Sequence, residues 1–152
     1  MKEIERKFLV HKTKWKPVGK GSKMKQGYLS VDPNRTVRVR IAGELAYLTI
    51  KGKSVGISRT ELEYEIPKRE AEILMGMCLD HPIEKTRYLE MPGSITWEID
   101  VFEGENTGLI MAEVELEKEE QIIDLPDWIK KEVSENPKYF NSWLSQNPYS
   151  KW

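Results

Sequence analysis

Residues 3–7 read Glu3-Ile4-Glu5-Arg6-Lys7, and this alternation of charged and apolar side chains predicts a β-strand with two different faces. Successive side chains along a strand point to opposite sides, so Glu3, Glu5 and Lys7 share one face and Ile4 lies on the other. The same alternation recurs in most of the strand-like segments that follow. One face of a whole sheet is therefore expected to be charged, with acids and bases interleaved.

Strand patterns bounded by Gly, Pro, Asn or Asp occur along most of the chain. They span residues 2–10, 24–31, 36–42, 45–52, 57–66, 83–90, 95–102 and 109–117. Short loops between so many strands favour an antiparallel sheet closed into a barrel, because closure removes the unpaired edges.

Helical patterns are confined to residues 67–79 and to a tail from 127 to about 147 that is broken at Asn136-Pro137. The prediction is a single α+β domain over residues 1–152, mainly β. It consists of an eight-stranded antiparallel barrel with helices packed outside, including a C-terminal helical tail at about 126–148.

The charged face has two interpretations. It could be a solvated sheet face with mixed cross-strand pairs. Alternatively, the apolar face points outward against the helices and the charged face lines a lumen, where charges are costly unless paired, hydrated or bound to a ligand. The persistence of charge across so many strands favours the lumen. The acids are Glu3, Glu5, Glu61, Glu63, Glu65, Glu98, Asp100, Glu113 and Glu115, and the bases are Lys7, Arg38, Arg40, Lys51, Arg59, Lys85 and Arg87.

This mixture of signs points to a ligand that contains both a metal ion and phosphates. Carboxylates suit a hard divalent cation, and Arg and Lys suit phosphate oxygens. Strand positions i and i+4 lie about 13 Å apart, so Glu3 to Lys7 spans a chain of several phosphates. The pairs Glu3/Glu5 and Glu113/Glu115 could supply metal ligands from facing walls.

Composition excludes several other classes. The net charge of −1 with 32 % charged residues gives no sign of a binder of nucleic acid or membrane surfaces. No signal peptide or membrane-spanning run is evident, so a cytoplasmic location is expected. The single cysteine, Cys78, excludes an intrachain disulfide and is expected to be a buried thiol. A homodimer formed through the apolar tail is plausible.

Eight short motifs follow one another along the chain: Glu3–Lys7, Gln26–Tyr28, Val37–Arg40, Leu48–Lys51, Arg59–Glu65, Lys85–Tyr88, Trp97–Phe102 and Ala112–Leu116. In this order they resemble the motifs of the CYTH-domain proteins, which are triphosphate tunnel metalloenzymes, and in particular of their small stand-alone bacterial type. An isolated Glu-x-Glu-x-Lys would be weak support, but the ordered set covers nearly the whole chain.

The resemblance implies an eight-stranded tunnel that binds triphosphates with Mg²⁺ or Mn²⁺. The implied metal ligands are Glu3, Glu5, Asp100, Glu113 and Glu115. The implied phosphate-binding residues are Lys7, Arg38, Arg40, Lys51, Arg59, Lys85 and Arg87. Glu61 and Glu63 either bind metal or orient neighbouring bases, and the orienting role is favoured.

The leading hypothesis is metal-dependent hydrolysis of a terminal phosphoanhydride, with two metal ions and no covalent nucleophile. Lys85 and Tyr28 are candidates for proton transfer, although phosphate-holding or structural roles are favoured for both. Inorganic tripolyphosphate is the preferred substrate, cleaved to pyrophosphate and phosphate. The alternatives are nucleoside or thiamine triphosphates, adenylate cyclisation, and a sensor that binds polyphosphate or nucleotide without turnover.

Overall fold

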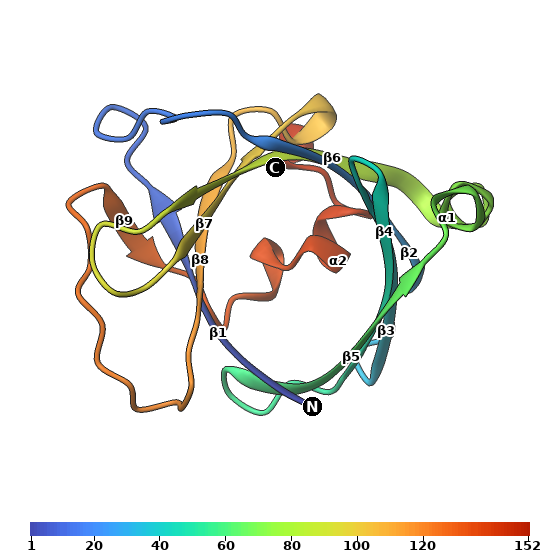
Figure 1. Cartoon of the computed structure of the whole chain (residues 1–152), viewed down its shortest axis with the longest axis horizontal. Coiled ribbons are helices and arrows are strands. Elements are labelled where there is room, and N and C mark those ends of the chain that lie inside the picture. The colour runs from blue at the N-terminus through green and yellow to red at the C-terminus, as the bar shows by residue number, and fades with distance from the viewer.

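The strands of the protein form a closed antiparallel ring in the computed structural model, which describes residues 1–152 (Figure 1). Their order around the barrel is β5-β4-β3-β2-β6-β7-β8-β1, and β1 also pairs with β5, which closes the ring. The predicted eight-stranded antiparallel barrel is therefore confirmed. The barrel strands are β1 (Lys2–Val10), β2 (Ser22–Ser30), β3 (Arg35–Ala42), β4 (Leu45–Gly52), β5 (Ser58–Ile66), β6 (Leu79–Glu90), β7 (Trp97–Phe102) and β8 (Ile110–Glu115).

Helix α1 (Lys68–Met75) packs on the outside of the barrel, as predicted. It begins after Pro67, and Ala71 is buried in one small cluster with Val39 of β3 and Ala46 of β4. The predicted helix at 67–79 is too long, because the chain turns after Gly76 and β6 already begins at Leu79.

The prediction of a helical tail is largely wrong. Residues Ile129–Glu132 form a ninth strand, β9, which pairs antiparallel with the second half of β1. β1 pairs with β5 through Lys2–Ile4 only, so the same edge further along is free to accept another strand. Backbone pairing at this edge outweighs the helical pattern of the tail.

The remainder of the tail contains only short helical pieces, and these lie at one end of the lumen rather than outside. They are the 3₁₀ turns η2 (Pro137–Tyr139) and η3 (Tyr149–Lys151) and the single-turn helix α2 (Asn141–Leu144). Figure 1 shows α2 within the outline of the ring. A further 3₁₀ turn, η1 (Gly104–Asn106), connects β7 to β8.

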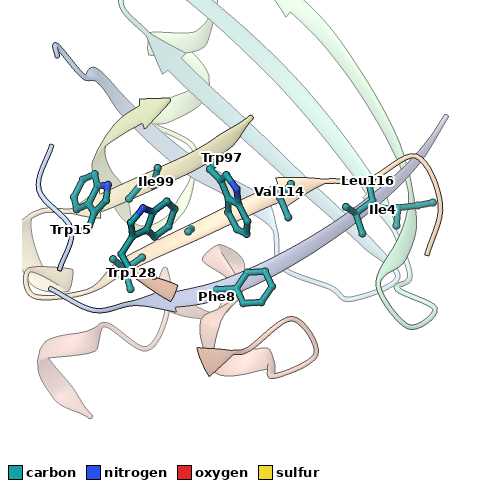
Figure 2. Packing of buried hydrophobic residues seen from close by; sticks show 10 residues of the cluster. Ile4, Phe8, Trp15, Trp97, Ile99, Val114, Leu116 and Trp128 are labelled. Carbon is teal, nitrogen blue, oxygen red and sulfur yellow. The ribbon is translucent and has the colours of Figure 1, made fainter. Parts of the chain in front are cut away.

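Apolar clusters lie on the outward face of the barrel, and the largest lies over β1, β7 and β8 (Figure 2). Trp97 makes edge-to-face contacts with Phe8 and Trp128, with ring centroids 5.5 Å and 5.6 Å apart. Trp15 in the β1–β2 connection and Trp128 just before β9 are buried in this cluster. Loops and β9, rather than the predicted helices, therefore cover this part of the outer face.

No helix in the structure is both long enough and apolar enough to cross a membrane.

Candidate active site

Side chains from all eight barrel strands line one cavity of about 250 Å³. Of its 24 lining residues only three are hydrophobic. The charged face therefore surrounds a lumen, as the sequence indicated. The predicted site residues that line this cavity are Glu3, Glu5, Lys7, Tyr28, Arg38, Arg40, Lys51, Arg59, Glu61, Glu63, Lys85, Arg87, Glu113 and Glu115.

Charge is unevenly distributed within the lumen, and one part is dominated by carboxylates. Burial and the charge of Glu113 raise the pKa of Glu5 well above its ordinary value. Burial and the charge of Glu3 likewise raise the pKa of Glu61. Lys51 lies within this group, with its Nζ 2.8 Å from Glu3 Oε2 and 3.4 Å from Glu61 Oε2. Lys51, and Lys7 at 4.0 Å from Glu113, thus compensate only part of the negative charge.

The carboxylate group fits a divalent cation by its chemistry. Its donors are hard oxygen atoms, which Mg²⁺ and Mn²⁺ prefer. Glu3 Oε2 is buried and receives no hydrogen bond of suitable direction, although Lys51 is close. No three acidic side chains converge into a complete site. Mg²⁺ usually takes one or two carboxylates and completes its shell with water and substrate phosphates, so the arrangement is compatible with it.

A second part of the lumen carries an excess of positive charge, from Arg38, Arg40, Lys85 and Arg87. Burial and the neighbouring charges of Arg38 and Arg87 lower the pKa of Arg40 to about 10. Burial, opposed by Asp100 but assisted by Arg87 and Arg40, lowers the pKa of Lys85 to about 7. Arg38 Nε is a buried donor without a partner in the protein. These bases repel one another, which an anionic ligand would relieve.

Asp100 occupies a different place from the one expected of a metal ligand. It is fully buried and does not line the cavity. Its carboxylate accepts hydrogen bonds from Arg87 Nε and Nη2 at 2.8 and 2.9 Å, and Oδ2 also lies 2.8 Å from Lys85 Nζ. Both oxygens are therefore engaged with bases behind the cavity wall.

The two ambiguous acids on β5 both line the cavity and both contact bases. Glu63 Oε2 accepts hydrogen bonds from Thr49 Oγ1 at 2.8 Å and from Arg38 Nη2 at 3.4 Å. Glu61 contacts Lys51, as described above. These contacts are compatible with the favoured orienting role, which stays a prediction.

Sequence reasoning missed the contribution of the tail. Lys7 Nζ donates to the backbone oxygen of Tyr139 at 3.2 Å and lies 5.6 Å from the ring centre of Phe140. Asn141 accepts hydrogen bonds from Lys85 and from Gln26. These residues meet only through long-range pairing of the tail with β1, for which the local sequence carries no signal.

One end of the lumen is closed by apolar residues on the same faces of the strands as the lumen charges. Ile83, Phe102 and Met111 follow or precede Lys85, Asp100 and Glu113 by two residues and are at most 2 % exposed. Leu144 of α2 packs into this cluster and is 1 % exposed. The tail and this cluster thus close the lumen where residues 139–142 lie.

The chain is similar in sequence and fold to proteins that are already named. The family model of the CYTH domain matches residues 1–145. An inorganic triphosphatase of Acetivibrio thermocellus is 50 % identical over 149 residues, covering 97 % of this chain and 96 % of that protein. An inorganic triphosphatase of Nitrosomonas europaea is 35 % identical over 151 residues, covering 95 % of this chain and 97 % of that protein.

A crystal structure of an inorganic triphosphatase superposes with a TM-score of 0.66 at 34 % identity, covering 93 % of this chain and 96 % of that one. The fold is thus shared with a solved protein of similar sequence. The chain belongs to the CYTH family.

Proposed function

We propose that this protein is a metal-dependent triphosphatase that hydrolyses inorganic tripolyphosphate to pyrophosphate and phosphate. The observation that carries the proposal is the separation of charge within a single closed lumen, with Glu3, Glu5 and Glu61 on one part and Arg40 and Arg87 on another. A metal–polyphosphate complex carries the matching pair of charges. The two inorganic triphosphatases that the chain resembles along almost its whole length support the same substrate class.

The residues divide into two sets of roles. Glu3, Glu5, Glu113 and Glu115 would hold Mg²⁺ or Mn²⁺, two ions per site. When bound, these ions offset phosphate charge and lower the pKa of coordinated water. The bases Lys7, Arg38, Arg40, Lys51, Arg59, Lys85 and Arg87 hold the phosphates in line and stabilise charge on the leaving group, on which phosphoryl transfer chiefly depends.

Asp100 we assign to positioning, because it holds Lys85 and Arg87 from behind the wall. The pKa of Lys85 is lowered to about 7, so its side chain can hold a proton near neutral pH. Lys85 could therefore bind a phosphate and also donate a proton to it. Tyr28 lines the cavity, but its hydroxyl accepts a hydrogen bond from Gln26 at 3.3 Å, which favours a wall role.

An inorganic substrate matches the lining better than a nucleotide does. Sites for organic ligands are usually lined mainly by hydrophobic and aromatic side chains. Here only Tyr28, Ile57 and Phe140 are hydrophobic, and Tyr28 is 4 % exposed. The cavity therefore offers little apolar surface to a nucleobase or a thiazole ring. The predicted cytoplasmic location and homodimer stay predictions.

The test is phosphate release from tripolyphosphate, ATP and thiamine triphosphate, each with Mg²⁺, Mn²⁺ or EDTA. We expect turnover of tripolyphosphate that needs metal and is lost in Glu5→Gln and Arg40→Ala. Lys25→Ala, an exposed base on the outside of β2, is the matched control and should retain activity. Tight binding without release from any substrate would instead establish a sensor, and preferred turnover of ATP would overturn the inorganic substrate.

A further inference from the structure

Asn141, the first residue of α2, joins the tail to the cationic part of the lumen. Its Oδ1 accepts hydrogen bonds from Lys85 Nζ at 2.9 Å and from Gln26 Nε2 at 3.0 Å. The amide nitrogen of Gln26 donates to this same atom, so the atom facing Lys85 must be the amide oxygen. The orientation of this amide is therefore determined by its partner.

Gln26 extends the connection to a second base. Its Oε1 accepts from Arg40 Nε at 3.0 Å, and because a guanidinium group can only donate, this amide also has a single possible orientation. Directed hydrogen bonds thus connect Arg40 and Lys85 through Gln26 and Asn141. The tail holds two bases of the lumen in place through this connection.

The amide nitrogen of Asn141 is left with a different task. Asn141 lines the cavity, and its Nδ2 donates to no acceptor of the protein, while both hydrogen bonds of its side chain use Oδ1. Two N–H donors are therefore available to a ligand in the lumen. Phosphate oxygens are strong acceptors, and hydrogen bonds to charged acceptors are the stronger ones.

The location of Asn141 decides which part of a ligand it meets. Tyr139 and Phe140 contact Lys7 beside it, and the cluster containing Leu144, Phe102 and Met111 closes the lumen behind it. A phosphate chain that enters the lumen cannot extend past this point. Its inner end must lie next to Asn141 and the bases that Asn141 holds.

We infer that Asn141 binds the terminal phosphoryl group of the triphosphate through Nδ2, while its Oδ1 keeps Lys85 and Gln26 in position. This inference rests on the proposed function and adds a substrate contact supplied by the tail rather than by the barrel. A role only as an acceptor for Lys85 and Gln26 is the competing structural explanation.

Asn141→Asp separates the two explanations. The aspartate keeps an oxygen for Lys85 and Gln26 but loses the Nδ2 donors and adds a negative charge. Asn141→Ala removes donor and acceptor without a charge. Ser142→Asp adds the same charge at the next cavity-lining residue and measures the general effect of that charge. Thermal unfolding of each variant checks that the fold is retained.

Binding of a hydrolysis-resistant imido analogue of tripolyphosphate, with Mg²⁺, is measured by calorimetry and compared with KM and kcat for tripolyphosphate. We expect both Asn141 variants to bind at least about tenfold more weakly, the loss expected for a hydrogen bond to a charged group. Asn141→Asp should weaken binding at least about threefold more than Ser142→Asp does. KM should rise in parallel with the loss of affinity.

An Asn141→Asp variant that binds the analogue as well as Ser142→Asp does would overturn the inference, because an acceptor role would then suffice. An unchanged protein that neither binds the analogue nor turns over tripolyphosphate would instead overturn the proposed function. The two failures are therefore distinguishable.

Discussion

The carboxylate of Asp100 lies 2.8 Å from the ammonium group of Lys85, and both side chains are almost completely buried, at 0 % and 1 % exposed. Arg87 shares the same carboxylate through two hydrogen bonds. One acid therefore compensates two bases that line the lumen. Charges removed from water in this way are tolerated only while each keeps its partner.

Asp100→Asn should lower the free energy of unfolding by about 3–5 kcal/mol, because it leaves two buried bases without their shared counter-ion. Urea unfolding followed by circular dichroism measures this change. Glu98→Gln is the matched control, because Glu98 contacts Arg87 alone and its side chain is 36 % exposed. This substitution should lower the free energy of unfolding by less than about 1 kcal/mol. Equal effects of the two variants would contradict the role given to Asp100.

Metal addition tests the assignment of Asp100 as a positioning residue rather than a ligand. Any ion that binds the folded state raises Tm. We expect Mg²⁺ to raise the Tm of Asp100→Asn and of the unchanged protein alike, since Asp100 already uses both oxygens on bases. A shift lost in Asp100→Asn but kept in Glu98→Gln would return Asp100 to the metal ligands.

Glu5→Gln should stabilise the metal-free protein while abolishing activity. Burial and Glu113 raise the pKa of Glu5, so its charged form is unfavourable in the folded state. A neutral amide removes that repulsion but is a poorer metal ligand. We expect a higher Tm in EDTA, a smaller rise in Tm on adding Mg²⁺, and loss of phosphate release. Glu117→Gln, an exposed acid beyond β8, should change none of these.

The barrel and most of its lumen could be predicted because strand alternation is local. The side chains of Glu3, Glu5 and Lys7 had to share a face wherever the strand paired. The tail could not be predicted in the same way. Ile129–Glu132 carry no strand alternation and form β9 only because β1 has a free edge beyond Ile4.

The different roles of the charged residues also could not be predicted from the sequence. Asp100 and Glu113 both occupy inward positions, yet one lies behind the wall and the other lines the cavity. The difference depends on the bases of β6 beside Asp100: Arg87 lies directly across from it, and Lys85, which lies opposite Phe102, reaches it from two residues away. That relationship is set by strand register rather than by either local motif.

Glu132 on β9 holds the tail against the barrel, and its contribution to stability depends on pH. Its hydrogen bonds with Arg6, at 3.0 and 2.7 Å, lower the pKa of Glu132 below its ordinary value of 4.5. A lowered folded-state pKa stabilises the protein above the unfolded-state value, and this stabilisation is lost as pH falls through the folded-state value.

Glu132→Gln should therefore lower the free energy of unfolding by less than about 1 kcal/mol at pH 7, since the ion pair between Arg6 and Glu132 is partly exposed. The cost should be constant down to pH of about 5 and shrink below about 4.5. Urea unfolding at several pH values measures it, with Glu135→Gln, an exposed acid of the same segment, as the control. A cost that does not shrink in acid would show that packing, not charge, makes the difference.

Gly27 on β2 allows the end of α1 and the following turn to approach the barrel closely. A Cβ at this position would lie 2.6 Å from Cys78 Sγ, 2.9 Å from Cys78 Cβ and 3.1 Å from Met75 Sδ. Gly27→Ala should lower the free energy of unfolding by about 1–3 kcal/mol, as overpacking does elsewhere. Cys78→Ala removes the nearest atom but leaves its Cβ, so the double variant should recover only part of this loss.

Urea unfolding of both single variants and of the double variant measures the coupling between Gly27→Ala and Cys78→Ala. The double variant should be more stable than the sum of the two single effects predicts, by at least about 0.5 kcal/mol. Gly93→Ala is the control, because a Cβ there meets no atom within 4 Å and should change stability by less than about 0.5 kcal/mol. Strictly additive effects at positions 27 and 78 would show that the helix moves away from the barrel instead of being strained against it.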